Sequence, residues 1–178
     1  MNEGTVLGVD PSLRGTGWAV VAPNPYANIP FHCVVYGVIR MKHTQPVPEC
    51  LLAIENELSK IIQIHHPQLF AIESTIFVQS HTTAINLGAA RGAALIAAAK
   101  FKLLIHEYAP KIVKQAVVGY GNAAKQQVTY MIRNLCGLDR NPPPDASDAI
   151  AVAITCLQHM KHMQHKPSSP QSASLPRA

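Results

Sequence analysis

The sequence predicts an α/β protein built on one five-stranded mixed β-sheet flanked by helices. Short β-branched runs alternate with longer stretches of helical periodicity along the chain. The first three runs follow one another closely, which favours an antiparallel meander, whereas later runs are separated by helices, which favours parallel strands. A chain of 178 residues, 48% of them hydrophobic, is long enough for one core, so we expect a single domain.

The first three strands are predicted by apolar runs bounded by turn residues. The run at residues 5–10, T-V-L-G-V-D, ends in an acid and is followed by Pro11 and two glycines, which mark a turn. Two further strands are expected at residues 17–22 and 32–40, because a loop rich in Pro and Asn separates these two runs.

The rest of the chain alternates strands with helices. Short runs of the buried type predict strands at residues 68–72 and 103–106. Helical periodicity or helix-forming composition predicts helices at residues 48–65, 82–100, 111–118, 123–135 and 145–160. The residues expected to cap the second of these helices are His81, Thr82 and Thr83.

The C-terminal end has a different composition. Residues 164–178 are rich in Pro and Ser, so we expect a disordered tail after a domain that spans residues 1–163. The segment from Met1 to Gly8 lacks a signal-peptide pattern, and the longest uncharged apolar run, residues 92–99, is far shorter than the roughly 20 residues that span a bilayer. We therefore expect a cytoplasmic protein with no membrane partner.

The charge balance favours a polyanionic partner. Lys and Arg outnumber Asp and Glu by 15 to 10, which gives a formal net charge of +5 and a pI near 9.1. Basic surfaces attract nucleic acids because neutralised phosphates release their counterions. Many basic proteins bind no nucleic acid, so a functional assignment has to rest on motifs.

Four of the ten acids stand at positions that suggest a common site. Asp10 ends the first strand, Glu73 follows the fourth, and Asp145 and Asp148 lie three residues apart at the head of the last helix. If the first and fourth strands are parallel neighbours, their acids lie side by side, and the i, i+3 pair shares one helix face. Four convergent carboxylates would hold Mg²⁺ or Mn²⁺, which prefer oxygen ligands. Taken singly, three of these acids have ordinary structural alternatives. Asp145 also fits a helix N-cap, Asp148 a position that the helix dipole favours, and Asp10 the start of a turn.

The same acids belong to motifs of a known family. The chain resembles the RuvC family of Holliday-junction resolvases in the stretches Leu7-Gly8-Val9-Asp10-Pro11, Phe70-Ala71-Ile72-Glu73, Leu87-Gly88 with Ala90-Arg91-Gly92, Val113-Lys114-Gln115 with Val117-Val118-Gly119, and Asp145-Ala146-Ser147-Asp148-Ala149. The similarity runs from Val6 to Thr155. It implies an RNase H-like fold and a crossover junction endodeoxyribonuclease, which resolves Holliday junctions by symmetric nicking of two opposing strands in homologous recombination and DNA repair.

The resemblance also implies roles for single residues. The catalytic metal ligands would be Asp10, Glu73, Asp145 and Asp148, with two Mg²⁺ ions, or Mn²⁺ in their place. Lys114 and Lys125 would lie near the scissile phosphate or the junction strands. Arg14 and Arg91 are further candidates for phosphate contacts, and plain surface charge is the alternative for all four basic residues.

Two positions depart from the family pattern. The family usually has Gly directly after the first Asp-Pro, whereas Ser12 stands there in this chain. The family also commonly places an aromatic residue three positions after the Glu, in a loop that enters the junction centre. Here that position is Ile76 and Phe77 follows, so Phe77 is the candidate for stacking on the junction bases.

A junction substrate implies a dimer, because one active site per chain can cut two symmetry-related strands only if two chains associate. The helix that contains residues 88–99, rich in small side chains, is the candidate interface, and packing on the sheet is its alternative role. A branch-migration motor complex is the further partner that the resemblance suggests.

Two other functions fit part of the pattern. Gly8-x-Asp10 followed by Gly15 and Gly17 also resembles the phosphate loop of actin-like ATPases and sugar kinases, but those folds need a second domain and a second glycine-rich loop. A DNA-binding module that does not cut would need only the basic surface. The presence of all four acids argues against that second alternative.

Overall fold

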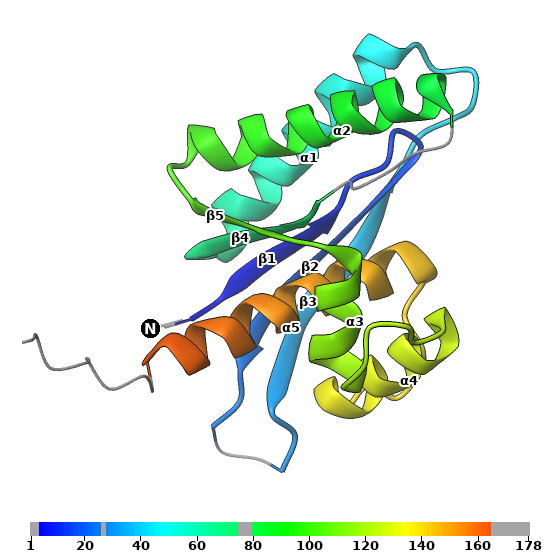
Figure 1. The fold of residues 1–178 in the computed structure, drawn as a ribbon. Helices are drawn as coiled ribbons and strands as arrows, with labels where there is room; N and C mark the ends of the chain where they lie inside the picture. The colour runs from blue at the N-terminus through cyan, green and yellow to red at the C-terminus, as the bar shows by residue number, and fades with distance from the viewer. Residues whose placement is uncertain (1–3, 26–27, 75–79, 165–178) are drawn as a thin grey trace, which may run out of the picture.

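The computed structural model describes residues 4–25, 28–74 and 80–164, and it confirms the predicted α/β class with a five-stranded mixed sheet (Figure 1). The elements along the chain are β1 (Val6–Asp10), β2 (Gly15–Pro23), β3 (Phe31–Arg40), α1 (Val47–His65), β4 (Leu69–Glu73), α2 (His81–Lys100), β5 (Leu104–Tyr108), α3 (Pro110–Val118), α4 (Lys125–Cys136) and α5 (Pro144–Gln164).

The strand order is β3-β2-β1-β4-β5. The first three strands form the expected antiparallel meander, and β4 runs parallel to both β1 and β5. The first and fourth strands are therefore parallel neighbours, as the sequence argument assumed. Their register pairs Val9 with Ile72, so the next residues, Asp10 and Glu73, come at the same level of the sheet.

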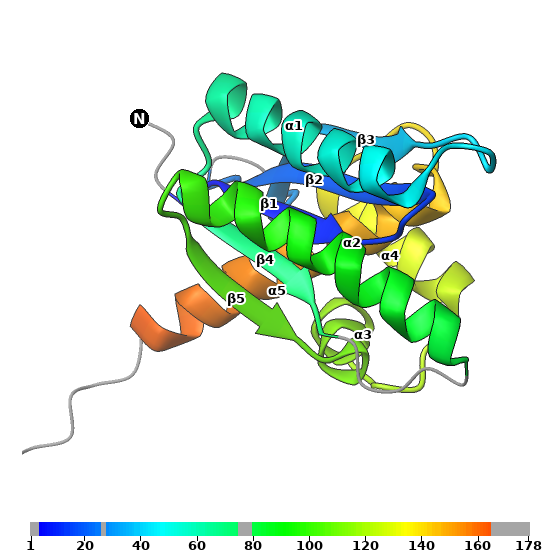
Figure 2. The same ribbon diagram turned by 90° about the horizontal axis from the view of Figure 1, so that it is seen from above.

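Helices cover both faces of the sheet (Figures 1 and 2). We call the face under α1 and α2 the aliphatic face, because large side chains fill its core, among them Leu7, Phe70 and Ile72. We call the other face, which α5 covers together with α3 and α4, the acidic face. Its core combines large residues, such as Ile150 and Ile154, with small ones, such as Ala149 and Ala153, where α5 meets the sheet. No helix in the described ranges is long and apolar enough to cross a bilayer.

Two glycines allow α5 to lie close against the acidic face. A Cβ atom at Gly8 would collide with the backbone oxygen of Ala149, and a Cβ atom at Gly17 would collide with the backbone oxygen of Asp145. The two glycines after β1 are typical of a turn, but Gly15 belongs to β2, where it pairs with Arg40. The role of Gly8 and Gly17 is to leave room for α5 rather than to bend the chain.

Several predicted boundaries move by a few residues. The N-cap of α2 is Ser80, whose side chain accepts a hydrogen bond from the Thr83 backbone, so the expected capping by His81, Thr82 and Thr83 is wrong. Helix α5 ends at Gln164, which the sequence argument assigned to the tail, because helical hydrogen bonding continues past the last buried turn. The remainder of the predicted tail lies outside the described residues.

Candidate active site

Asp10 and Glu73 are brought to the acidic face by the alternation of strand side chains. Gly8 meets α5, so Asp10, two residues later on the same strand, faces that helix as well. Ala71 belongs to the core under α5, and the same alternation directs Glu73 toward that side. The two carboxylates thus share one face at the carboxyl ends of neighbouring parallel strands.

Asp145 and Asp148 come to the same place from the first turns of α5. Asp145 Oδ2 lies 3.2 Å from the position that a Cβ atom would take at Gly15. The helix begins at Pro144, so Asp145 lies inside the first turn, and the alternative that it is the N-cap is wrong. The hydroxyls of Ser147 and Thr129 are 3.1 Å apart, which ties this end of α5 to α4.

The pKa values report how closely the acids approach one another. Burial raises the pKa of Asp10 to about 7, and the charges of Asp148, Glu73 and Asp145 contribute in the same direction. Burial also raises the pKa of Glu73, with a further contribution from Asp148. A carboxylate that is buried among other carboxylates is costly to ionise. The structure therefore places the four predicted acids within electrostatic range of one another, where their charges repel.

Two lysines face this cluster. Lys125, the first residue of α4, places its Nζ 3.2 Å from Asp148 Oδ2, and the charge of Asp148 raises the pKa of the lysine. Lys125 and Lys114 both lower the pKa of Glu73, so Lys114 on α3 lies within electrostatic range as well. The Lys125 side chain is 79% exposed, which leaves it accessible to a ligand in solution.

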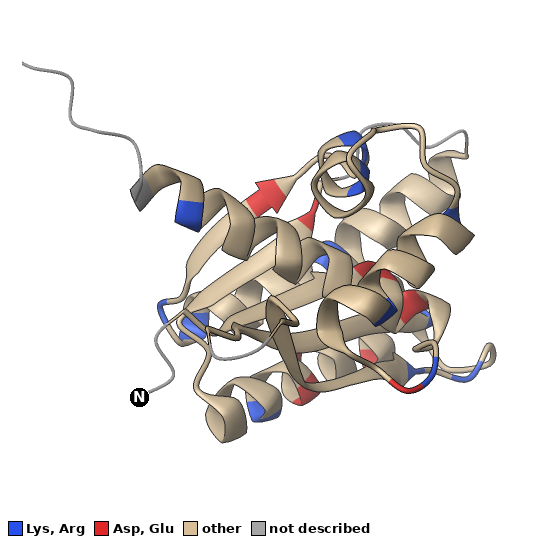
Figure 3. Cartoon of the chain, turned by 90° about the horizontal axis from the view of Figure 1, so that it is seen from below, with Lys and Arg blue, Asp and Glu red and all other residues tan. Residues whose placement is uncertain are grey.

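Acidic and basic segments meet at the head of α5. Figure 3 views the acidic face and shows acidic and basic segments next to each other where α5 begins. A negatively charged cluster with cations around it can bind both a metal ion and a phosphate.

Arg14, in the turn after Asp10, binds backbone oxygens of another loop. Its guanidinium Nη1 donates to the backbone oxygens of Lys42 at 2.7 Å and Gln45 at 2.8 Å, and it lies 3.1 Å from Cys50 Sγ. Cys50 is buried on the aliphatic face. Arg14 therefore holds the loop between β3 and α1 onto the β1–β2 turn, and it stands on the side of the sheet opposite to the four acids.

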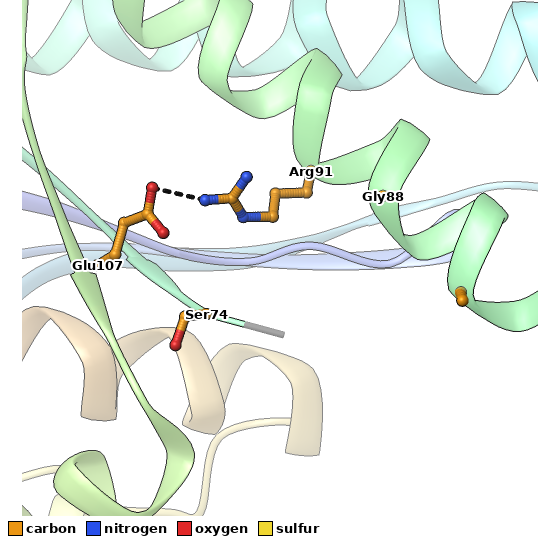
Figure 4. Close-up of a pocket in the computed structure, with 5 residues that line it drawn as sticks. Ser74, Gly88, Arg91 and Glu107 are labelled. Carbon is orange, nitrogen blue, oxygen red and sulfur yellow. Dashed lines mark ion pairs between the residues drawn. The ribbon is translucent and has the colours of Figure 1, made fainter. Parts of the chain in front are cut away.

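Arg91 also lies away from the acids. It projects from α2 and forms an ion pair of 2.6 Å with Glu107 on β5 (Figure 4). The pair lines a pocket of about 200 Å³ together with Ser74 and Gly88. Glu107 pairs in register with Ile72, whose side chain is buried on the aliphatic face. The predicted Phe77 lies outside the described residues.

The donor set suits a hard divalent cation, because the cluster offers carboxylate oxygens and no thiolate. In the described part of the chain, no three carboxylate, imidazole or thiolate groups are yet arranged around a single point. One oxygen of Asp148 is instead paired with the Lys125 ammonium. We expect metal binding to require that Asp148 exchange this ammonium for the ion.

The strand order, the helices on both faces and the acids at the ends of β1 and β4 define an RNase H-like enzyme. The family model described as crossover junction endodeoxyribonuclease RuvC matches residues 6–156. The chain therefore belongs to the RuvC family of crossover junction endodeoxyribonucleases, and it is a nuclease. Membership of this family explains the Gly8-x-Asp10 motif, so the resemblance to the phosphate loop of actin-like ATPases and sugar kinases is not needed.

Relatives and solved structures agree with this assignment. The RuvC of Akkermansia muciniphila is 43% identical over 152 residues, which cover 85% of this chain and 89% of the relative. The RuvC of Pelotomaculum thermopropionicum is 42% identical over 155 residues, 86% of this chain and 93% of the relative. The structure of T. thermophilus RuvC in complex with a Holliday junction substrate superposes with a TM-score of 0.85 at 29% identity, covering 93% of this chain and 100% of that one.

Proposed function

We propose that this chain resolves Holliday junctions by nicking two opposing strands symmetrically, in recombination and DNA repair. The proposal is supported by its membership of the family and by the related T. thermophilus protein, which was solved with a Holliday junction. The observation that carries it is the convergence of Asp10, Glu73, Asp145 and Asp148 on one face of the sheet, reflected in the raised pKa of Asp10. From such a substrate we further expect the enzyme to act in the cytoplasm.

In this proposal the four carboxylates hold two Mg²⁺ ions, or Mn²⁺ in their place. The ions would supply an activated water and would neutralise charge as the phosphodiester is cut. Asp10 takes the central position, because the charges of all three other acids act on its pKa. A cation relieves this repulsion, so the cost of burying Asp10 in ionised form falls when the site is loaded.

The two lysines are proposed to bind the phosphates of the cut strand. Lys125 is mostly exposed and pairs with a single oxygen of Asp148, so it can exchange this contact for a phosphate oxygen. Lys114 acts on Glu73 from α3 and would neutralise charge on the other side of the site. Both lysines supply positive charge where the scissile phosphate has to approach four acids.

A second copy of this chain is the proposed partner of α2. The inner side of this helix is buried, whereas Ile85 is 72% exposed and Ile96 57% exposed. Nothing lies within 4 Å of the positions that Cβ atoms would take at Gly88 and Gly92. These residues recur at helical spacing and form one open apolar stripe, which suits a two-fold interface. Ile96→Asp is expected to convert a dimer to a monomer in sedimentation analysis, without loss of helical content.

Two further expectations accompany the proposal. Phe77, next to the position where the family commonly has an aromatic residue, would stack on bases at the junction centre, and Phe77→Ala would then reduce cleavage more than binding. A branch-migration motor complex would deliver the junction. Both follow from the family resemblance.

The proposed function is tested by cleavage of a synthetic four-way junction and of a linear duplex, each with Mg²⁺ or EDTA. We expect symmetric nicks in the junction only, lost in EDTA and in Asp10→Asn while junction binding persists. Asp139→Asn is the matched control, because Asp139 is exposed in the loop before α5 and should leave cutting unchanged. Equal cutting of both DNAs would indicate a general nuclease, and binding without cutting would indicate a DNA-binding module.

A further inference from the structure

Arg40 lies on the acidic face, at the same end of the sheet as the four acids. It pairs with Gly15 across the β2–β3 ladder. Residues that are directly opposite on neighbouring strands point to the same face of a sheet. Gly15 meets Asp145, and Gly17 meets the backbone of the same residue, so these positions of β2 face α5. The side chain of Arg40 therefore leaves β3 on the side where the acids lie.

Arg40 and its neighbours form a positive rim at the end of β3. Arg40, Lys42 and His43 are exposed. In the described ranges of the chain, the ion pairs involve other residues, and no carboxylate lies within 4.0 Å of the charged groups of Arg40 or Lys42. This differs from Arg91 and Lys100, which are both paired with glutamates. We call Arg40 and Lys42 the β3 rim.

The rim is held in place by the clamp around Arg14. The guanidinium of Arg14 binds the backbone oxygen of Lys42 itself, and its own backbone oxygen accepts a hydrogen bond of 3.1 Å from the Met41 amide. The Gln45 amide donates to the Lys42 oxygen at 3.1 Å. A loop that is already ordered loses less conformational entropy when a charged side chain on it binds a ligand. Arg14 thus fixes the loop, whereas Arg40 has no ion-pair partner among the residues that the structure describes.

The strand order places this rim and Lys114 on opposite sides of the acids. Arg40 stands on β3, and the acids stand on β1 and β4 with β2 in between. Lys114 belongs to α3, which directly follows β5 at the opposite edge of the sheet. Adjacent strands are about 4.8 Å apart, so two steps from β3 to β1 amount to about 10 Å, which is about three base steps along the axis of a DNA duplex.

We propose that the β3 rim is a second phosphate-binding site, which holds the DNA backbone a few nucleotides away from the scissile phosphate. This inference rests on the proposed function, because it takes the DNA cut by the four acids as its ligand. The rim carries point charges on an exposed surface, so it contributes affinity and alignment and does not read the base sequence.

The test is the salt dependence of binding to a four-way junction in EDTA, where no cutting occurs. Arg40→Ala and Lys42→Ala are each expected to weaken binding about fivefold to tenfold near 0.1 M salt and to reduce the slope of log K against log salt by about 1. Arg40→Lys should retain most of the affinity, because a phosphate contact needs the charge. The matched control is Lys60→Ala, which removes an exposed lysine that is paired with Glu57 on α1.

A second measurement identifies the contact on the DNA. Ethylation of single phosphates removes their charge, and it should weaken wild-type binding at a phosphate a few nucleotides from the nick while having no added effect in Arg40→Ala. Wild-type affinity and slope in Arg40→Ala and in the Arg40→Ala/Lys42→Ala double variant, beside a loss in Lys114→Ala, would overturn the inference and leave the proposed function standing. Failure of the wild type to bind the junction would overturn both.

Discussion

The two faces of the sheet solve different packing problems. On the aliphatic face, large side chains such as Leu7, Phe70 and Ile72 fill the space beneath α1 and α2. On the acidic face, Gly8 and Gly17 have no side chains, and the backbone of α5 comes into direct contact with β1 and β2. Both arrangements bury apolar area, but only the second also fixes the position of a helix whose first turns carry two acids.

This difference indicates where the molecule is tolerant and where it is not. A core of flexible aliphatic side chains can absorb a small change by repacking, but a backbone oxygen that touches a strand cannot move without the whole helix. The acidic face therefore tolerates substitutions less well, because its packing holds Asp145 and Asp148 beside Asp10. Substitutions on the two faces should therefore differ in their effects on stability and cleavage.

The largest loss of folding stability is expected for Gly17→Ala. The new methyl group would collide with the backbone of Asp145 and force the head of α5 away from β2. Overpacking of this kind costs about 3 kcal/mol, and a displacement of about 1 Å at the acids would reduce cleavage about a hundredfold. Urea unfolding and the junction cleavage rate measure the two losses.

The matched substitution on the other side of the molecule is Gly92→Ala. Nothing lies within 4 Å of the Cβ position at Gly92, which is part of α2, so the substitution should stabilise the helix by about 0.5–1 kcal/mol. Equal stability losses in Gly17→Ala and Gly92→Ala would contradict the distinction between the two faces.

Asp10→Asn is expected to lower activity and to raise stability. Cleavage should fall by at least about a thousandfold, because the central carboxylate is lost. In EDTA the folded protein should become more stable near pH 8, because the amide carries no charge in the self-repelling cluster. The gain is at most about 4 kcal/mol, from a pKa raised from 3.8 to about 7.

The pH dependence gives the sign of this effect. The folded state holds the Asp10 proton more tightly than the unfolded state, so the contribution of Asp10 favours folding below pH 4 and is lost as the pH rises toward 7. Thermal unfolding in EDTA should show this loss in the wild type and not in Asp10→Asn. A parallel pH dependence in both proteins would show that Asp10 is not the buried acid.

The third prediction compares Arg14 with Arg40. Arg14→Ala should destabilise the protein by about 2 kcal/mol, because two backbone oxygens lose a charged donor. Arg14→Lys should not restore this stability, since one ammonium does not reproduce the planar guanidinium. Arg40→Ala should leave the urea midpoint unchanged, because the Arg40 side chain is exposed and unpaired within the described residues. A midpoint that falls equally in both variants would remove the distinction.

These two arginines also show how far the sequence reaches. The sheet, its helices and the acids at the ends of two strands follow from local patterns of apolar periodicity. The meeting of Asp10 with Glu73 also requires β1 and β4 to be parallel neighbours, which the structure shows. The face on which an arginine lies depends on strand register, and register between β2 and β3 is set by pairing that local patterns do not reveal. Local patterns consequently offer Arg14 as a candidate for a phosphate contact or for plain surface charge, and they do not single out Arg40.

The glycines of β2 show the same limit. Gly15 and Gly17 have turn-forming potential, and a turn does precede β2. Only the packing of α5, more than a hundred residues later in the chain, makes the missing side chains necessary at these positions. A glycine that repeats at a spacing of two within an apolar run is nevertheless a signal of close backbone approach to one face of a strand.

The smallest effect is expected for the ion pair of Arg91 with Glu107 on the aliphatic face. Arg91 is 25% exposed and Glu107 is 47% exposed, so a double-mutant cycle in urea should give a coupling of only about 0.5–1 kcal/mol. Junction affinity should change by less than about twofold in Arg91→Ala, because Glu107 already neutralises the guanidinium. A loss of salt slope of about 1 in Arg91→Ala but not in Glu107→Ala would instead make Arg91 a DNA contact. Phosphate binding would then extend around the edge of the sheet to its aliphatic face, and the division between the two faces would describe packing alone.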